Sequence, residues 1–332
     1  WENMILHSIR PNMEDGFLLP YHDAIKFQEE HPDFDPSELV VVAPSDKNFE
    51  FSYASEHVSN DSAIRVLLQC YQVWQKAKEL GIGENHEKAL SWIHDELQRI
   101  QKVRGYYPGM GAALCAFGIE KGHFIAAEII NNLKNDTENP WEIFGAALDN
   151  PKNILSNEVA SLIPASSKKL YQRLKAKEKS VRLNLLYLLS RFELSIDQAK
   201  RIFVKEEREF LDPNITDEQI LNNPYLIYEL NINQIDPVSL HTIDLGLYLK
   251  NKPSDLLPAD SFYEDPQDSS RVRALTIQQL QMSASLGHTL IPRKELVKQI
   301  RALAIVPKCN IDSDYYELAE DSFPGAIEKV NM

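Results

Sequence analysis

Residues 105–123 read GYYPGMGAALCAFGIEKGH, and this stretch decides how the helical part of the chain is organised. Four of the twelve glycines of the chain lie between Gly105 and Gly118. Its Pro-Gly-Met-Gly sequence must interrupt a helix, because proline and glycine both disfavour a helix interior. Two structures satisfy the pattern: a tight packing turn, or a helix-hairpin-helix turn whose backbone amides bind a DNA phosphate. The second interpretation names Gly109 and Gly111 as DNA contacts.

Helical patterns flank this stretch on both sides. A helix with apolar residues at a period of 3.6 is expected to start at Ser59 or Asn60, either of which can cap it. Asn85 is expected to cap a second amphipathic helix. After the turn, helix is predicted at 124–133, and the sequence NDTENPWEIF at 135–144 predicts a break followed by a new helix.

The remaining segments are predicted from the same signals. Residues 157–208 are expected to be helical, and 211–269 to hold short helices only. Two helices are expected within 271–304, with Thr289 as a cap of the second. The acidic segment NIDSDYYELAEDSF at 310–323 is expected to be partly strand.

Strand signals occur before residue 59. The apolar run LVVVAP at 39–44 and the partly alternating FEFSYASEHV at 49–58 both predict strands. The fold class is therefore mainly α, multi-helical with helix-hairpin-helix and helix-turn-helix units, and with a small α+β piece at the N-terminus. We expect four parts: a strand-containing segment at 1–58, a helical domain at 59–156, a basic helical and helix-hairpin-helix region at 157–269, and a helix-turn-helix-like unit with an acidic tail at 270–332.

Composition indicates a soluble protein of the cytoplasm. The chain has 332 residues, 43% of them hydrophobic and 25% charged, with no run of apolar residues long enough to cross a membrane. Its three cysteines, Cys70, Cys115 and Cys309, lie far apart, which argues against a disulfide framework and fits a reducing compartment. Because the chain begins with Trp1, we expect it to be a fragment of a longer protein.

Charge is unevenly distributed along the chain. The net charge is −14, which by itself disfavours a nucleic-acid partner. Between Lys168 and Arg208, however, twelve lysines and arginines stand against five acids. Such a local excess is the kind of feature that a polyanion site leaves in a sequence, and a lysine-rich solvated helix is the structural alternative.

Motifs exclude several chemistries. No Gly-Lys-Ser/Thr sequence occurs, so the chain lacks the phosphate loop needed to hydrolyse ATP. Two groups of acids and histidines are candidate metal or proton-transfer sites, but a solvated acidic face and a helix cap explain them better. An enzyme that uses either group is therefore the least favoured of three hypotheses for function, and the other two follow below. The groups are His22, Asp23, Glu29, Glu30, His31, Asp33 and Asp35, and Glu56, His57 and Asp61.

The C-terminal half resembles a known family. The segments LLSRFELSIDQAKRIF and ILNNPYLIYEL, followed by GHTLIPRKEL at 287–296, are similar to the region ahead of the motor in RecD-like superfamily-one DNA helicases, which are related to the exonuclease V alpha subunit. The likeness covers about 185–305 well, and the stretch around the Pro-Gly-Met-Gly turn more loosely. In the family the hairpin after Asn-Pro-Tyr carries a glycine pair, whereas here no glycine follows until Gly246.

The resemblance implies an accessory, non-catalytic region of an ATP-dependent DNA helicase. It would bind the backbone of single-stranded or forked DNA without sequence preference, next to downstream motor domains that use ATP and magnesium; this chain itself needs no cofactor and no metal. The predicted DNA-binding residues are Lys168, Lys169, Arg173, Lys175, Lys179, Arg182, Gly109, Gly111, Arg293 and Lys294.

A second hypothesis is a protein-interaction module. The acidic remainder of the chain and its amphipathic helices would then dock a partner nuclease or the helicase motor, and contact with DNA would be incidental. The mostly acidic composition favours this alternative.

Overall fold

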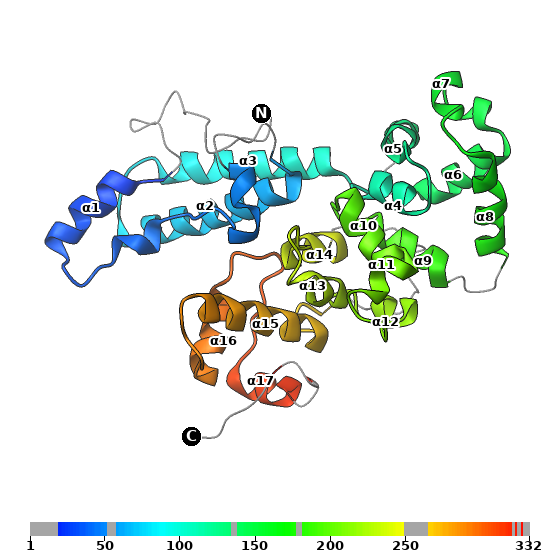
Figure 1. Cartoon of the computed structure of the whole chain (residues 1–332). Helices are drawn as coiled ribbons and strands as arrows, with labels where there is room; N and C mark the ends of the chain where they lie inside the picture. The colour runs from blue at the N-terminus through cyan, green and yellow to red at the C-terminus, as the bar shows by residue number, and fades with distance from the viewer. Residues whose placement is uncertain are drawn as a thin grey trace. The chain divides into compact units, whose positions relative to one another are not determined.

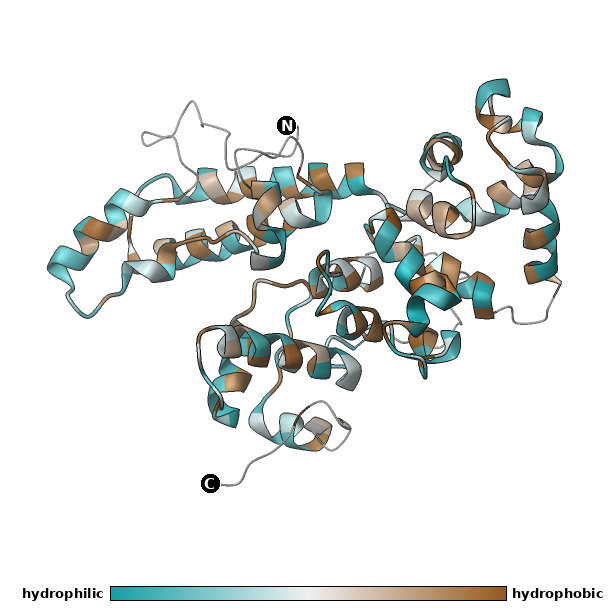
Figure 2. Cartoon of the chain, viewed as in Figure 1, coloured by the Kyte–Doolittle hydropathy of each residue, from teal (hydrophilic) through white to brown (hydrophobic). Residues whose placement is uncertain are grey.

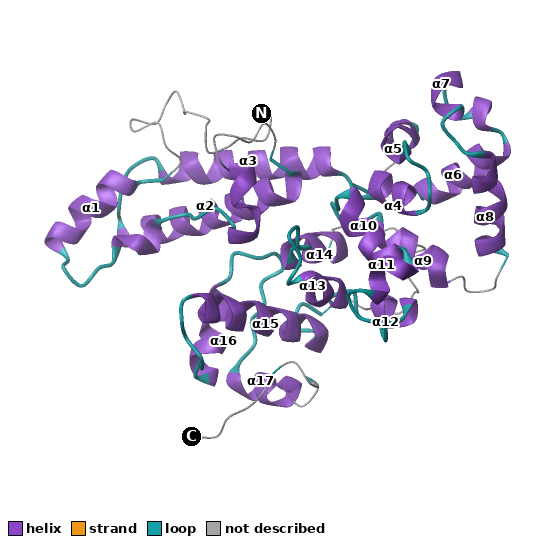
Figure 3. Ribbon diagram, in the orientation of Figure 1, coloured by secondary structure: helices purple, strands orange, loops and turns teal. Residues whose placement is uncertain are grey.

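The computed structural model of the chain is helical throughout the residues that it describes, which are 19–51, 58–133, 138–176, 181–248, 265–320 and the single positions 323 and 327. Within these ranges it holds seventeen α-helices and short 3-10 helices, and no β-strand (Figures 1 and 3). The mainly α fold class is thus confirmed. The chain divides into two compact units, Trp1–Gly105 and Tyr106–Met332, a division at a different place from the four predicted parts.

Unit 1 is built around a pair of long helices. Ser59 caps the first, because its side chain accepts a hydrogen bond from the backbone N–H of Ser62 at 3.4 Å. Asn85 occupies the predicted cap position of the second, although its side chain makes no capping hydrogen bond. A buried ion pair between Asp61 and Arg104 joins the start of one helix to the end of the other. The elements are α1 (Tyr21–Glu30), η2 (Pro36–Leu39), η3 (Ser45–Phe51), α2 (Asn60–Leu80) and α3 (His86–Arg104).

The strand predicted at 39–44 is wrong. Leu39 ends a 3-10 helix, Val40 after it is extended, and residues 40–44 pair with no strand among the described residues. Extended residues need such a partner to form a sheet. The prediction for 49–58 is also wrong up to Phe51, which lies in η3, and residues 52–57 lie outside the described ranges. Glu50 instead accepts hydrogen bonds from the N–H and hydroxyl of Ser59, which fasten η3 to the start of α2.

Unit 2 has one large apolar core. Within it α4 packs against α5 and α10, and α9 packs against α12. The helices are α4 (Met110–Ala116), α5 (Gly122–Asn131), α6 (Pro140–Asp149), η4 (Pro151–Asn153), α7 (Asn157–Ala160), α8 (Ala165–Lys175), α9 (Val181–Leu189), α10 (Ile196–Phe203), α11 (Lys205–Glu209), α12 (Asp217–Asn222), α13 (Leu226–Asn231), α14 (Leu240–Leu247), α15 (Ser269–Ser285), α16 (Arg293–Ala302) and α17 (Ser313–Glu320).

The two Asn-Pro-aromatic segments share a local geometry. The Asn139 side chain accepts a hydrogen bond from the N–H of Trp141 at 2.9 Å, and Asn223 accepts one from Tyr225 at 3.1 Å. Both rings are buried, and each donates a hydrogen bond inward, from the Trp141 indole to Ser190 and from the Tyr225 hydroxyl to a carboxylate of α14. These segments therefore fix helix starts to the core of unit 2.

Two predictions near the C-terminus are wrong. The segment 310–323 forms the helix α17 instead of a strand over Ser313–Glu320, because Asp312 accepts a hydrogen bond from Tyr315 N–H at 2.7 Å and starts the helix. Thr289 does not cap α16, since Pro292 occupies the position before its first residue. Pro292 has no N–H and fits that position at little cost.

A buried ion pair holds the C-terminal helices to the rest of unit 2. The fully buried guanidinium of Arg271 in α15 donates to Asp244 in α14 at 2.7 Å and to the carbonyls of Pro266 and Pro307 at 2.6 and 2.7 Å. The Tyr225 hydroxyl donates to the same carboxylate at 2.7 Å. Because the charges are paired and the donors satisfied, this cluster is structural.

Candidate nucleic-acid interface

The helix α8 is fixed to the core of unit 2 by Tyr171. The ring of Tyr171 makes edge-to-face contacts with Phe117 and Phe144, and its hydroxyl donates to the carbonyl of Trp141 at 2.9 Å. Burial raises the pKa of this phenol well above its usual value. The buried side of α8, which also holds Ser167, therefore keeps the helix in one orientation. Both hydrophilic and hydrophobic bands occur along α8 (Figure 2).

Four of the predicted residues are exposed on α8, and of these Lys169 and Arg173 lie opposite Tyr171. Lys169, Arg173 and Lys175 are exposed and pair with no carboxylate among the described residues. Lys168 is exposed and forms a surface ion pair with Asp149 at 3.0 Å. We call Lys168, Lys169, Arg173 and Lys175 the α8 basic surface. Lys179, predicted with them, lies outside the described residues.

The predicted contact Arg182 lies elsewhere. Its guanidinium donates to Asp217 at 3.2 Å and to the carbonyl of Phe203 at 2.5 Å, and it stacks on the Phe203 ring at 4.1 Å. Asp217 also pairs with the buried Arg208. Arg201, from the same stretch, donates to the carbonyl of Asp236 at 2.5 Å. Arg182 and Arg208 thus join α9 and α11 to α12, and Arg201 joins α10 to the segment after α13. We exclude Arg182 from the α8 basic surface.

The Pro-Gly-Met-Gly turn is buried in unit 2. The amide of Gly109 donates to the carbonyl of Ser190 at 3.0 Å, so this N–H already has a partner inside the protein. The Phe192 carbonyl occupies the place where a Cβ on Gly109 would lie, and His123 does the same at Gly111. The close packing explains both glycines without a ligand, and the geometry favours the packing turn over the phosphate-binding turn.

The second predicted basic group lies at the start of α16. Arg293 is half-buried and pairs with Glu317 of α17 at 3.3 Å. Lys294 is exposed. Two further exposed cations, Lys298 and Arg301, follow Lys294 at spacings of four and three residues, which place all three on one face. The spacing is present in the sequence, whereas the sequence-based prediction names only Arg293 and Lys294 in this helix.

The acidic and histidine groups form no site in the described residues. The group from His22 to Asp35 is solvated, with His31 stacked on Phe27 at 3.9 Å. Asp35 caps η2, and the hydrogen bonds from Ser37 lower the pKa of its carboxyl. Asp61 is paired with Arg104, and Glu56 and His57 lie outside the described residues. Across the described residues, no three potential metal ligands converge.

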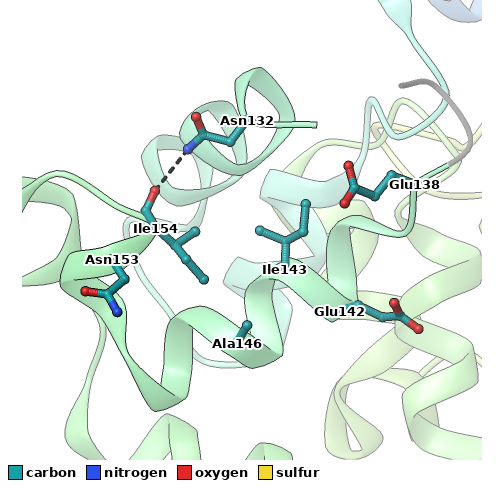
Figure 4. Close-up of a pocket in the computed structure, with 7 residues that line it drawn as sticks. All are labelled: Asn132, Glu138, Glu142, Ile143, Ala146, Asn153 and Ile154. Carbon is teal, nitrogen blue, oxygen red and sulfur yellow. Dashed lines mark hydrogen bonds between the residues drawn. The ribbon is translucent and has the colours of Figure 1, made fainter. Parts of the chain in front are cut away.

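A cleft of about 420 Å³ lies beside α6 (Figure 4). It is lined by Glu138 and Glu142, by two asparagines, and by three apolar residues. The amide of Asn132 donates to the carbonyl of Ile154 at 2.9 Å across it. Two carboxylates repel phosphate, so this cleft is a poor place for a nucleic acid.

No helix in the described part of the chain is both long and apolar enough to cross a bilayer. No protein-family model matches this chain, and neither a curated protein nor a solved structure does.

Proposed function

We propose that this chain is a non-catalytic nucleic-acid-binding region that holds the phosphate backbone of DNA on the α8 basic surface. The observation that carries the proposal is the presence of four exposed cations on a single helix that Tyr171 anchors to the core. In a chain of net charge −14, such a surface is the region where a polyanion would meet the least repulsion.

The chemistry of the surface suits backbone contact rather than base recognition. Lysine and arginine bind phosphate through charge, and this contact carries no sequence information. The aromatic residue of α8, Tyr171, is buried and offers no face on which a base could stack. Binding should therefore be sensitive to salt and indifferent to sequence.

The proposed place of the chain is ahead of the motor in a RecD-like DNA helicase. Support comes from the resemblance of residues 185–305 and from the lack of a phosphate loop in the sequence. ATP and magnesium would be used by motor domains outside this chain. The accessory region would then contribute affinity for DNA while the motor supplies movement.

The test is fluorescence anisotropy of the chain with single-stranded, duplex and forked DNA at 50–200 mM salt. If the α8 basic surface neutralises about four phosphates, it contributes about −3 to −4 to the slope of log K against log salt on duplex. The variant Lys168→Glu, Lys169→Glu, Arg173→Glu, Lys175→Glu should flatten the slope by about that amount.

A matched control reverses four exposed cations elsewhere that have no ion-pair partner among the described residues: Lys88, Lys102, Lys121 and Lys152. This variant has the same net charge as the α8 variant and should keep most of the wild-type slope. Equal slopes for both variants would mean that binding depends on net charge alone and would overturn the assignment to α8.

Protein docking is the second candidate, and exposed apolar side chains favour it. Phe210 is 91% exposed, Leu286 is 77% exposed, and Ile235 is fully exposed. Absence of DNA binding at 50 mM salt, together with capture of the purified motor region by the wild-type chain and loss of capture in Phe210→Ser, would replace the first proposal by this one.

A further inference from the structure

The solvent face of α16 forms a second cationic surface in unit 2. Lys294, Lys298 and Arg301 are all exposed and lie on one face, and none pairs with a carboxylate among the described residues. We call them the α16 basic surface. The other face of the helix buries Leu296, Val297 and Ile300. The three cations therefore have a fixed direction, away from the core.

Helix stability does not explain this arrangement. Lys294 and Lys298 are four residues apart and Lys298 and Arg301 are three apart, so each pair places like charges side by side. Lys294 also lies in the first turn, where the helix dipole disfavours a cation. Three neighbouring cations repel one another in the free protein, and a bound anion would relieve that repulsion.

Neighbouring acids do not neutralise the surface. Glu317 of α17 pairs with Arg293 on another side of the helix. Glu295, the single acidic residue of α16, is exposed and lies three residues before Lys298, but no ion pair joins it to Lys294 or Lys298. The cations are thus available to an external ligand.

The charge density of the surface matches a nucleic acid. The three residues span about 10.5 Å along the helix, at 1.5 Å for each residue. A DNA duplex carries one phosphate for about each 1.7 Å of its axis, so several phosphates lie within reach of three long side chains at once. The other exposed residues of α16, Glu295 and Ala302, offer no large apolar group for a protein partner.

We propose that the α16 basic surface is a second contact for the DNA backbone, separate from α8. The two surfaces lie on helices with different neighbours: α8 contacts α6 and α9, whereas α16 contacts α15 and α17. The inference rests on the proposed function of DNA binding and adds three residues to it, of which Lys298 and Arg301 were not predicted from sequence. Arg293 is left out because Glu317 already pairs with it.

The experiment measures duplex binding of the full chain at 50, 100 and 200 mM salt for two neutralised variants. The first is Lys294→Gln, Lys298→Gln, Arg301→Gln, and the control is Lys88→Gln, Lys121→Gln, Lys152→Gln, which removes three exposed cations elsewhere. Glutamine keeps the helix propensity close to that of lysine and arginine. Circular dichroism melts establish that each variant is folded before binding is compared.

If α16 contacts DNA, its variant should have a slope about 2 to 3 shallower than wild type. From 50 to 200 mM salt its affinity would then fall roughly 40-fold less than that of wild type. The control should match wild type in slope to within about 1.

A second measurement does not depend on substitution. Lysines of the wild-type chain are acetylated with and without a 20-base-pair duplex, and the modified residues are identified by mass spectrometry. Protection of Lys294 and Lys298, with Lys88 and Lys121 unprotected, supports the proposal.

The outcomes separate the two proposals. If the slope of log K against log salt becomes shallower only in the α8 variant, and Lys294 and Lys298 are unprotected, the α16 contact is overturned and the α8 surface stands. If the slope becomes shallower only in the α16 variant, the α16 contact is supported and the α8 contact is overturned. If the wild-type chain binds no duplex at 50 mM salt, both are overturned.

Discussion

The cations of α8 and the arginines of α9 to α11 come from one basic stretch of sequence, yet their surroundings differ. Lys169 and Lys175 are exposed and pair with no carboxylate among the described residues. Arg182, Arg201 and Arg208 donate to carboxylates and carbonyls inside unit 2. A local excess of positive charge in a sequence therefore does not measure the charge that the folded surface presents.

The chemistry of the two side chains explains the division. The planar guanidinium offers five donors and loses little hydration when it pairs, so arginine suits buried and half-buried contacts such as that of Arg182 with Asp217 and the Phe203 ring. The lysine ammonium is compact and strongly hydrated, which favours exposure. Three of the four exposed cations on α8 are accordingly lysines, and the fourth is Arg173.

The largest expected effect is a loss of stability when one of the buried arginines is replaced. Arg208→Met should lower the free energy of unfolding by about 3 kcal/mol, because it removes the buried partner of Asp217. Urea unfolding followed by circular dichroism measures the change. Lys205→Met on the same helix is the control and should cost less than about 0.5 kcal/mol, since its ion pair with Glu209 is exposed. Equal losses of unfolding free energy in the two variants would contradict the distinction between cations that hold the fold and cations that are exposed.

A smaller effect is expected from the anchor of α8, which is a neutral phenol and not an ion pair. Above pH 10.0, the usual value for tyrosine, the unfolded chain releases the Tyr171 proton while the folded chain keeps it, since burial raises the pKa. Stability should therefore fall as pH rises above 10, by at most about 1.4 kcal/mol for each pH unit from this residue.

Tyr171→Phe tests this alkaline loss. The variant gives up the hydrogen bond to Trp141, so it should be less stable than wild type at pH 8 by about 1 kcal/mol. The difference between the two proteins should shrink between pH 10 and pH 11, because phenylalanine does not ionise. A constant difference over this range in urea unfolding would contradict the role given to the phenol.

The smallest effect concerns the one paired lysine of the α8 basic surface. Asp149→Asn removes the partner of Lys168 and one negative charge beside it, so DNA affinity should rise roughly twofold to fivefold. Lys168→Gln should accordingly weaken binding less than Lys169→Gln does. Anisotropy at 50 mM salt compares the three variants, and a stronger effect of Lys168 would reverse the order inferred from the structure.

Local signals predicted where helices start. Ser59 caps α2 at the expected position, and Asn139 with Pro140 starts α6, because these residues act on the few backbone amides next to them. The run at 39–44 was wrongly predicted as a strand, since a strand depends on a partner that the run itself does not contain. Asp312 at the start of α17 is a capping signal that the sequence contained and the prediction missed.

The amino-acid sequence by itself determined the helical character of the chain, several of its helix starts and the place of its basic residues. Only the tertiary structure decided which of those residues face solvent, because burial depends on partners far away in the chain. Asp217 is 35 residues from Arg182, and Ser190, the partner of Gly109, directly follows α9. Contacts of this range are set by how the helices pack, and they separate the cations that hold the fold from those that stay exposed.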